Sequence, residues 1–180
     1  MRVLPVNFRD VGEALGLWLD PSPIPAGRLF RGGRFDPLMT AADLGSPGTI
    51  LNLRRGPDPD QLAGVRLVHV AADDDIENYD TRQRRVKVWI GKALSVLASS
   101  GLTWPVYLHC TSGRDRTGVV VAATLLAVGV PREVVAEEYL LSDGADPAAI
   151  ARAIDGMLES PPFTEADRAR LRVALVAPAG

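Results

Sequence analysis

The stretch VYLHCTSGRDRTGVVVAA, Val106 to Ala123, carries the only cysteine of the 180-residue chain. Cys110 stands where a short apolar run ends and a polar turn with glycines and arginines begins. A second apolar run follows this turn. The pattern predicts a buried strand over Val106–Cys110 and a helix over Thr117–Val128. This helix is apolar on nearly every side, so we expect it to lie at the centre of the fold.

Glycine and proline divide the rest of the chain into short strands and longer helices. Three further β-type runs are expected at Arg28–Gly32, Thr49–Arg54 and Arg66–Ala71. Periodicity predicts a helix over Tyr79–Ser99. Three more helices are expected from capping signals: one from Pro131 to Leu141, one after the cap residue Asp146, and one after Thr164. The spacing of Thr164 to Asp167 resembles a capping box. Strands alternating with helices, then a helical C-terminal third, predict a single α/β domain over residues 1–180. Its central sheet is expected to be mainly parallel and flanked by helices, with residues 1–6 and 178–180 as frayed tails.

Composition limits the possible classes of function. The chain is 47% hydrophobic and 23% charged, which is typical of a soluble globular protein. A formal net charge of −2 and a pI of about 5.7 argue against nucleic-acid binding. A single cysteine excludes an intramolecular disulfide. No segment resembles a signal peptide. The longest apolar run is too short to cross a bilayer. We therefore expect a cytoplasmic protein without membrane insertion; its oligomeric state stays open.

The turn after Cys110 has the properties of an anion site. Thr111 to Arg116 lead into a helix N-terminus, where unpaired N–H groups and the helix dipole favour negative charge. The same field stabilises a thiolate, so Cys110 is expected to be a nucleophile. The Arg116 guanidinium can hold two phosphate oxygens and stabilise charge on the transferred group. Gly113 permits an amide orientation that a Cβ would block, and the Thr117 hydroxyl can donate a hydrogen bond to the sulfur.

HCTSGRDRTG, His109 to Gly118, matches the H-C-x5-R-[ST]-G signature and resembles the cysteine-dependent protein tyrosine and dual-specificity phosphatases. It is most similar to the bacterial branch that reads H-C-x-x-G-K-D-R-T-G. Three N-terminal segments resemble blocks of that branch: NFRDVG from Asn7, GRLFRGG from Gly27 and ILNLRR from Ile50. One departure is Arg114, where the branch usually has lysine.

The resemblance implies a phosphatase-like fold and a two-step reaction through a phosphocysteine on Cys110, without a metal or cofactor. His109 would support the thiolate. A leaving oxygen needs a proton, and Asp73 best matches the position of the family's general acid, with Asp115 and Asp74 as alternatives. The residues expected to surround the phosphate are Thr111, Ser112, Gly113, Arg114, Asp115, Arg116 and Thr117.

Other functions fit the sequence less well. A catalytically silent phosphate-binding module would keep the loop but lack turnover, and a rhodanese-like sulfurtransferase would not need the Arg-Thr-Gly ending. ATP binding is excluded because Val119 follows where the nucleotide loop requires lysine. The expected partner is a phosphorylated protein or small molecule. Phosphotyrosine or dual-specificity protein substrates come first, and phosphoinositides or inositol phosphates are the alternative.

Overall fold

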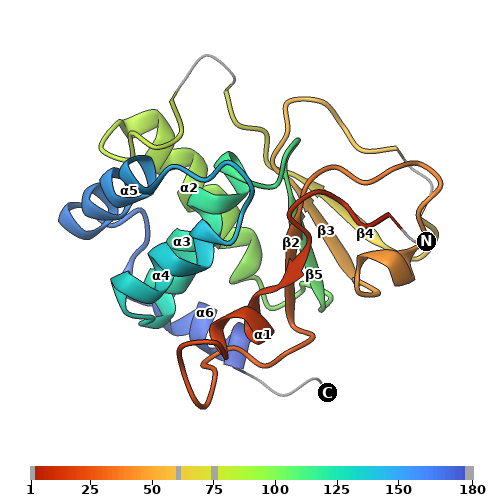
Figure 1. The fold of residues 1–180 in the computed structure, drawn as a ribbon, viewed down its shortest axis with the longest axis horizontal. Helices are drawn as coiled ribbons and strands as arrows, with labels where there is room; N and C mark the ends of the chain where they lie inside the picture. Colours follow the sequence, from red (N-terminus) through yellow and green to blue (C-terminus); the bar gives the residue numbers. More distant parts are fainter. Residues whose placement is uncertain (1–2, 60–61, 74–76, 177–180) are drawn as a thin grey trace.

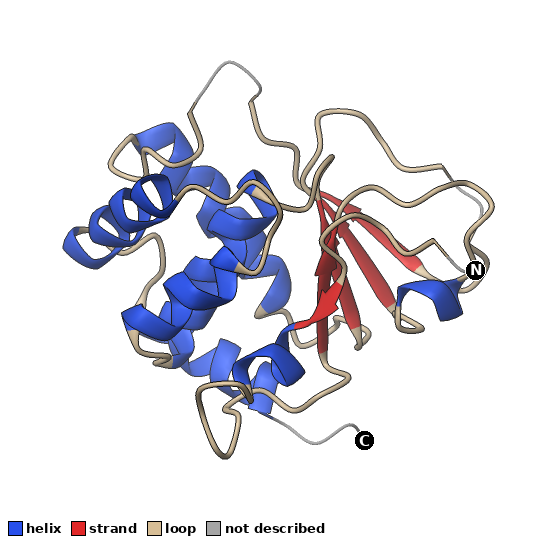
Figure 2. Ribbon diagram, in the orientation of Figure 1, coloured by secondary structure: helices blue, strands red, loops and turns tan. Residues whose placement is uncertain are grey.

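The computed structural model describes residues 3–59, 62–73 and 77–176. Its centre is a five-stranded sheet with the strand order β1-β2-β5-β3-β4 (Figures 1 and 2). β2, β5, β3 and β4 are parallel, and only β1 runs antiparallel to its neighbour. The strands are β1 Arg9–Asp10, β2 Leu29–Gly32, β3 Thr49–Asn52, β4 Arg66–His69 and β5 Val106–His109. The mainly parallel sheet is therefore confirmed.

The α-helices gather on one side of this sheet, and a short 3₁₀ helix with several loops lies on the other (Figure 2). The helices are α1 Val11–Leu15, α2 Arg84–Leu97, α3 Asp115–Val128, α4 Arg132–Leu140, α5 Pro147–Glu159, α6 Glu165–Val176 and the 3₁₀ helix Ala41–Leu44. α3 is buried along almost its whole length and packs against α2, α4, α5 and α6. Its apolar sequence on every side follows from this central place. No helix in the described ranges is long and apolar enough to cross a membrane.

The expected elements are present with small shifts of their ends. The long helix expected from Tyr79 begins only at Arg84, because residues 79–83 form turns. Asp146 caps α5, where its carboxylate accepts hydrogen bonds from two backbone amides. Thr164 and Asp167 form the reciprocal hydrogen bonds of a capping box at α6.

Three short elements were not predicted: β1, α1 and the 3₁₀ helix. β1 is two residues long, and α1 is five, so neither gives a periodic signal. Asp10 makes α1 possible, because its carboxylate accepts hydrogen bonds from the amides of Gly12 and Glu13 at 2.8 and 3.3 Å. β1 and α1 place the N-terminal segment at the edge of the sheet, beside β2.

The parallel register brings the carboxyl ends of three strands together. His109, the last residue of β5, pairs with Gly32 of β2 on one side and with Asn52 of β3 on the other. In an open parallel sheet, ligand sites form beyond these carboxyl ends. Cys110 follows His109 directly and therefore lies at the centre of this edge.

Candidate active site

The segment Cys110–Arg116, called the phosphate loop below, connects β5 to the first turn of α3. The predicted order of strand, tight turn and helix is therefore present. Cys110 is 1% exposed and ends the core on this side of the sheet. Gly113 has a φ of +67°, and a Cβ placed on it would lie 2.2 Å from the carbonyl carbon of Gly32. Only glycine fits this close packing of the loop on the end of β2.

Arg116 extends across the phosphate loop. Its Nη2 donates a hydrogen bond of 3.2 Å to the hydroxyl of Thr111, the residue that follows the cysteine. The contact brings the guanidinium from the second position of α3 back to the start of the loop. A planar cation in this place can bind two oxygens of a phosphate against the loop amides.

Thr117 is fully buried, and its hydroxyl has no hydrogen-bond partner in the described part of the chain. The predicted hydrogen bond from this hydroxyl to the Cys110 sulfur is therefore not formed in this structure. A buried hydroxyl without a hydrogen-bond partner lowers the stability of the fold, and a catalytic role is one reason for a protein to keep it.

His109 is buried between two oxygen acceptors. Its Nε2 lies 2.8 Å from a carboxylate oxygen of Asp58, and its Nδ1 lies 3.3 Å from the carbonyl of Cys110. The side chain of Asp58 is only 4% exposed and also forms an ion pair of 3.6 Å with Arg54. Sequence reasoning missed Asp58, because it lies in a proline-rich loop and is 51 residues away from its partner. The ring of His109 is thereby fixed directly behind the nucleophile.

Asp115 lies inside the phosphate loop and accepts two kinds of hydrogen bond. The Tyr79 hydroxyl donates to it at 2.5 Å, and the Arg114 guanidinium donates at 2.9 and 3.0 Å. Burial of the Asp115 carboxyl raises its pKa, but the hydrogen bonds from Arg114 and Tyr79 outweigh burial and hold the pKa below its usual range. Arg114 thus holds the carboxylate beside it.

The two other candidate acids lie on the segment before α2. Asp73 is about half exposed and forms an ion pair of 2.6 Å with Arg85. No contact joins Asp73 to the phosphate loop among the hydrogen bonds and ion pairs of the described residues. Asp74 lies outside the described residues.

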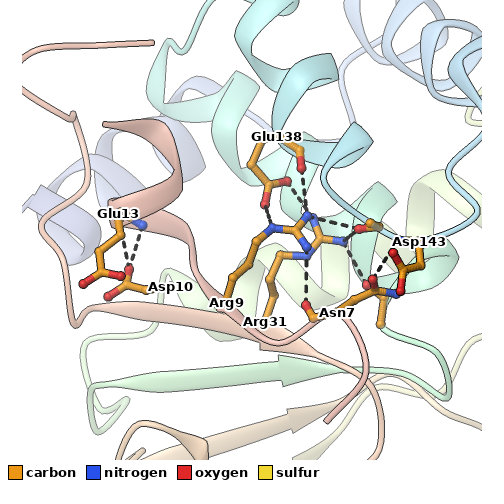
Figure 3. A network of polar contacts seen from close by, with 10 residues as sticks. Asn7, Arg9, Asp10, Glu13, Arg31, Glu138 and Asp143 are labelled. Atoms are coloured by element: carbon orange, nitrogen blue, oxygen red, sulfur yellow. Dashed lines mark hydrogen bonds and ion pairs between the residues drawn. The ribbon is translucent and has the colours of Figure 1, made fainter. Parts of the chain in front are cut away.

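Two arginines, Arg9 and Arg31, meet at Glu138 (Figure 3). Arg31 is fully buried; its guanidinium donates to the Glu138 carboxylate at 2.6 Å and to the Gly113 carbonyl at 2.9 Å. Arg9 binds the other oxygen of the Glu138 carboxylate at 2.8 Å. Sequence reasoning noticed Arg9 and Arg31 only as parts of resembling blocks and gave them no role, and it did not single out Glu138.

Comparison with known proteins agrees with this geometry. A family model described as "Tyrosine phosphatase family" matches residues 5–175, so the chain belongs to that family. The chain is 37% identical over 79 residues to the "Triple specificity protein phosphatase PtpB" of Mycobacterium tuberculosis. The matched part is 44% of this chain and 27% of PtpB, so this chain aligns with only about a quarter of that protein.

Two solved structures have a similar fold. The core catalytic domain of the PP-IP phosphatase SIW14 from S. cerevisiae, in complex with citrate, is 15% identical; the match covers 97% of this chain and 88% of that one with a TM-score of 0.55. Another Siw14 catalytic core is 14% identical, covers 86% of both chains and has a TM-score of 0.61. The α/β fold is thus similar to that of the two Siw14 catalytic cores, and the chain is a member of the tyrosine phosphatase family.

Proposed function

We propose that this chain hydrolyses phosphomonoesters through a phosphocysteine formed on Cys110. The observation that carries the proposal is the phosphate loop itself, in which a buried cysteine and Arg116, whose guanidinium binds the hydroxyl of Thr111, lie at the carboxyl edge of a parallel sheet. Cysteine is the only residue in this loop that forms a good nucleophile at neutral pH without a metal. As the only thiol of the chain, Cys110 is expected to work in a reducing compartment.

The reaction has two displacements at phosphorus. The Cys110 thiolate attacks the phosphorus atom, an S–P bond forms, and the bond to the leaving oxygen breaks. A carboxylic acid gives its proton to that oxygen. In the second displacement the same carboxylate takes a proton from water, the water oxygen attacks phosphorus, and inorganic phosphate leaves as the thiolate is restored. Arg116 and the loop amides bind the three other oxygens during both displacements.

For the acid, two observations support Asp115 over Asp73. Asp115 lies within the phosphate loop next to Arg116, whereas the Asp73 carboxylate is bound to Arg85 on the exposed side of α2. A dianionic phosphate bound in the loop would also raise the pKa of a nearby carboxyl through like-charge repulsion, which is the direction that a general acid needs.

The test is the release of phosphate from aryl phosphates in the presence of a chelator. Wild type is compared with Cys110→Ser, Asp115→Asn and Asp73→Asn, each on p-nitrophenyl phosphate and on phenyl phosphate, whose leaving group is poorer. Cys110→Ser should have no turnover. The acid variant should lose about 100-fold or more on phenyl phosphate and much less on p-nitrophenyl phosphate. If Asp73→Asn shows this difference and Asp115→Asn does not, Asp73 is the acid.

For the substrate, we propose phosphorylated protein, with phosphotyrosine or dual specificity. Family membership and the name of the PtpB relative support this choice. Equal concentrations of phosphotyrosine peptide, phosphoserine peptide, a short-chain phosphoinositide and an inositol polyphosphate would compare the classes by kcat/KM. A wild-type protein that binds tungstate but turns over none of them would be a silent phosphate-binding module instead.

A further inference from the structure

Residues from the N-terminal part of the chain hold the phosphate loop from outside. The Asn7 side-chain amide donates a hydrogen bond of 2.9 Å to the carbonyl of Ser112. The Arg31 guanidinium donates one of the same length to the carbonyl of Gly113. These contacts join positions that are 105 and 82 residues apart in the sequence. The conformation of the loop therefore depends on residues far outside its own motif.

The hydrogen bonds to the carbonyls of Ser112 and Gly113 determine which way the backbone amides of the loop face. In a trans peptide the carbonyl of one residue and the N–H of the next point in opposite directions. A third carbonyl, that of Thr111, accepts from the backbone amide of Arg34 at 3.1 Å. Three carbonyls held outside turn the amides of Ser112, Gly113 and Arg114 to the inside. Within the described part of the chain, none of these amides donates to another residue, so they can bind an anion.

Asn7 is itself held rigidly (Figure 3). Its side-chain oxygen accepts a hydrogen bond of 2.8 Å from the amide of Asp143, which fixes the orientation of its side-chain amide. Its carbonyl accepts from Arg9 at 3.3 Å. Its φ of +58° lies in the left-handed region, where asparagine is tolerated better than most residues. The side chain therefore connects the phosphate loop to the segment after α4.

Arg31 adds charge as well as a hydrogen bond. Burial lowers its pKa, while the attraction of Glu138 and of Cys110 acts in the opposite direction. Arg31 and Arg9 share the single carboxylate of Glu138, so a positive charge remains in excess behind the loop. Arg31 is a poor test residue, because removing it would leave Glu138 buried without its main partner.

We propose that Asn7 is a positioning residue of the phosphatase reaction: by holding the Ser112 carbonyl it aims the Gly113 amide at the bound phosphate. The inference rests on the proposed function of the phosphate loop. Asn7 does not touch the substrate; it acts through the peptide between Ser112 and Gly113.

The experiment uses two substitutions and a matched control. Asn7→Gly removes both side-chain hydrogen bonds but keeps a residue that tolerates the left-handed backbone. Asn7→Asp keeps an acceptor for the amide of Asp143 and puts a carboxylate oxygen, which cannot donate, against the Ser112 carbonyl. The control is Ser46→Gly, because exposed Ser46 is the other non-glycine residue with positive φ in the described ranges, at +52°. It lies in the segment before β3.

Five quantities are measured for each protein: the affinity for tungstate, kcat and KM for p-nitrophenyl phosphate, the rate of Cys110 alkylation by iodoacetate at pH 6, and the thermal midpoint. Both Asn7 variants should bind tungstate about tenfold more weakly, as expected for one hydrogen bond that supports a charged ligand. Their kcat should fall at least as much as their affinity, and alkylation should slow. Ser46→Gly should match wild type in all of these.

The outcomes separate the positioning role from a purely structural one. A lower thermal midpoint with unchanged tungstate affinity and kcat in the folded Asn7 variants would overturn the proposal. So would normal binding by Asn7→Asp beside weak binding by Asn7→Gly, because the Asp143 contact would then be the important one. A wild-type protein that neither binds tungstate nor turns over substrate would instead overturn the proposed function of the loop.

Discussion

The hydroxyl of Tyr79 donates a hydrogen bond of 2.5 Å to the carboxylate of Asp115 and lies 2.5 Å from the hydroxyl of Tyr139. The contacts join the turn before α2, the first residue of α3 and the last turn of α4. Burial, followed by the hydrogen bond to Asp115, raises the pKa of Tyr79 far above its ordinary value, so the hydroxyl stays protonated. Tyr79 can therefore act as a constant donor to the Asp115 carboxylate.

Replacing Tyr79 with phenylalanine should raise the pKa of Asp115. The hydrogen bond from Tyr79 favours the ionised carboxylate, and burial, which opposes ionisation, remains after the substitution. If Asp115 is the general acid, the alkaline limb of the kcat profile moves to higher pH, because the acid stays protonated longer. The measurement is kcat between pH 4 and 9 for wild type and Tyr79→Phe. If the alkaline limb stays at the same pH in Tyr79→Phe, Asp115 is not the group whose protonation limits kcat.

The contact between His109 and Asp58 predicts a loss of activity in Asp58→Asn. The substitution keeps the size of the side chain but replaces the charged acceptor of the His109 ring with a neutral amide. We expect kcat/KM to fall about tenfold and the free energy of unfolding to fall by about 1–3 kcal/mol, as for other hydrogen bonds to buried charged groups. Steady-state kinetics and urea unfolding measure both. Exposed Asp36, replaced by asparagine, serves as the control, and equal effects at both sites would contradict the role given to Asp58.

Gly113→Ala should abolish phosphate binding, whereas Gly27→Ala should not. Both glycines have positive φ, +67° and +77°, so both substitutions incur backbone strain of about 1–2 kcal/mol. Only at Gly113 would the new Cβ overlap with the backbone of Gly32 and Gly33; nothing lies within 4 Å at Gly27. Tungstate binding and kcat should therefore be lost in Gly113→Ala and close to normal in Gly27→Ala. A Gly113→Ala protein with wild-type affinity would show that the loop does not need this close packing.

Thr117→Val should separate stability from catalysis. Valine has nearly the same shape and removes a buried hydroxyl that lacks a hydrogen bond in the described structure. The free energy of unfolding should stay the same or rise by up to about 1 kcal/mol. If the hydroxyl binds sulfur during breakdown of the phosphocysteine, kcat falls and a burst of the first product appears in rapid mixing. A stable variant with normal kcat and no burst would contradict this role for Thr117.

The sequence predicts those parts of the site that depend on neighbours along the chain. Cys110, the turn after it and the helix that starts near Arg116 form one continuous segment, whose apolar flanks and glycines indicate strand, loop and helix in order. The four main strands were recognisable for the same reason. The residues that support this segment were not, because Asp58 and Glu138 come from elements distant in sequence and carry no pattern of their own.

The general acid shows this limit most clearly. Counting along the helix after the acidic segment favours Asp73, and this assignment stays a prediction beside Asp115. In the structure α2 begins at Arg84, five residues after the expected start at Tyr79, so part of the segment that was counted as helix consists of turns. Asp115 gains its surroundings from Tyr79, which no local pattern joins to it. Periodicity locates elements well, whereas tertiary contacts decide the environment of a single side chain.

The dependence of the phosphate loop on both Asn7 and Glu138 has a consequence for when the protein becomes reactive during its synthesis. The chain leaves the ribosome N-terminus first, so Asn7, Arg9 and Arg31 appear long before the cysteine. When Cys110 emerges, Glu138, whose carboxylate binds Arg31, has not yet left the ribosome. A nascent chain that ends before α4 therefore carries the complete signature motif without a formed anion site, and its thiol should react slowly until the fourth helix has been added.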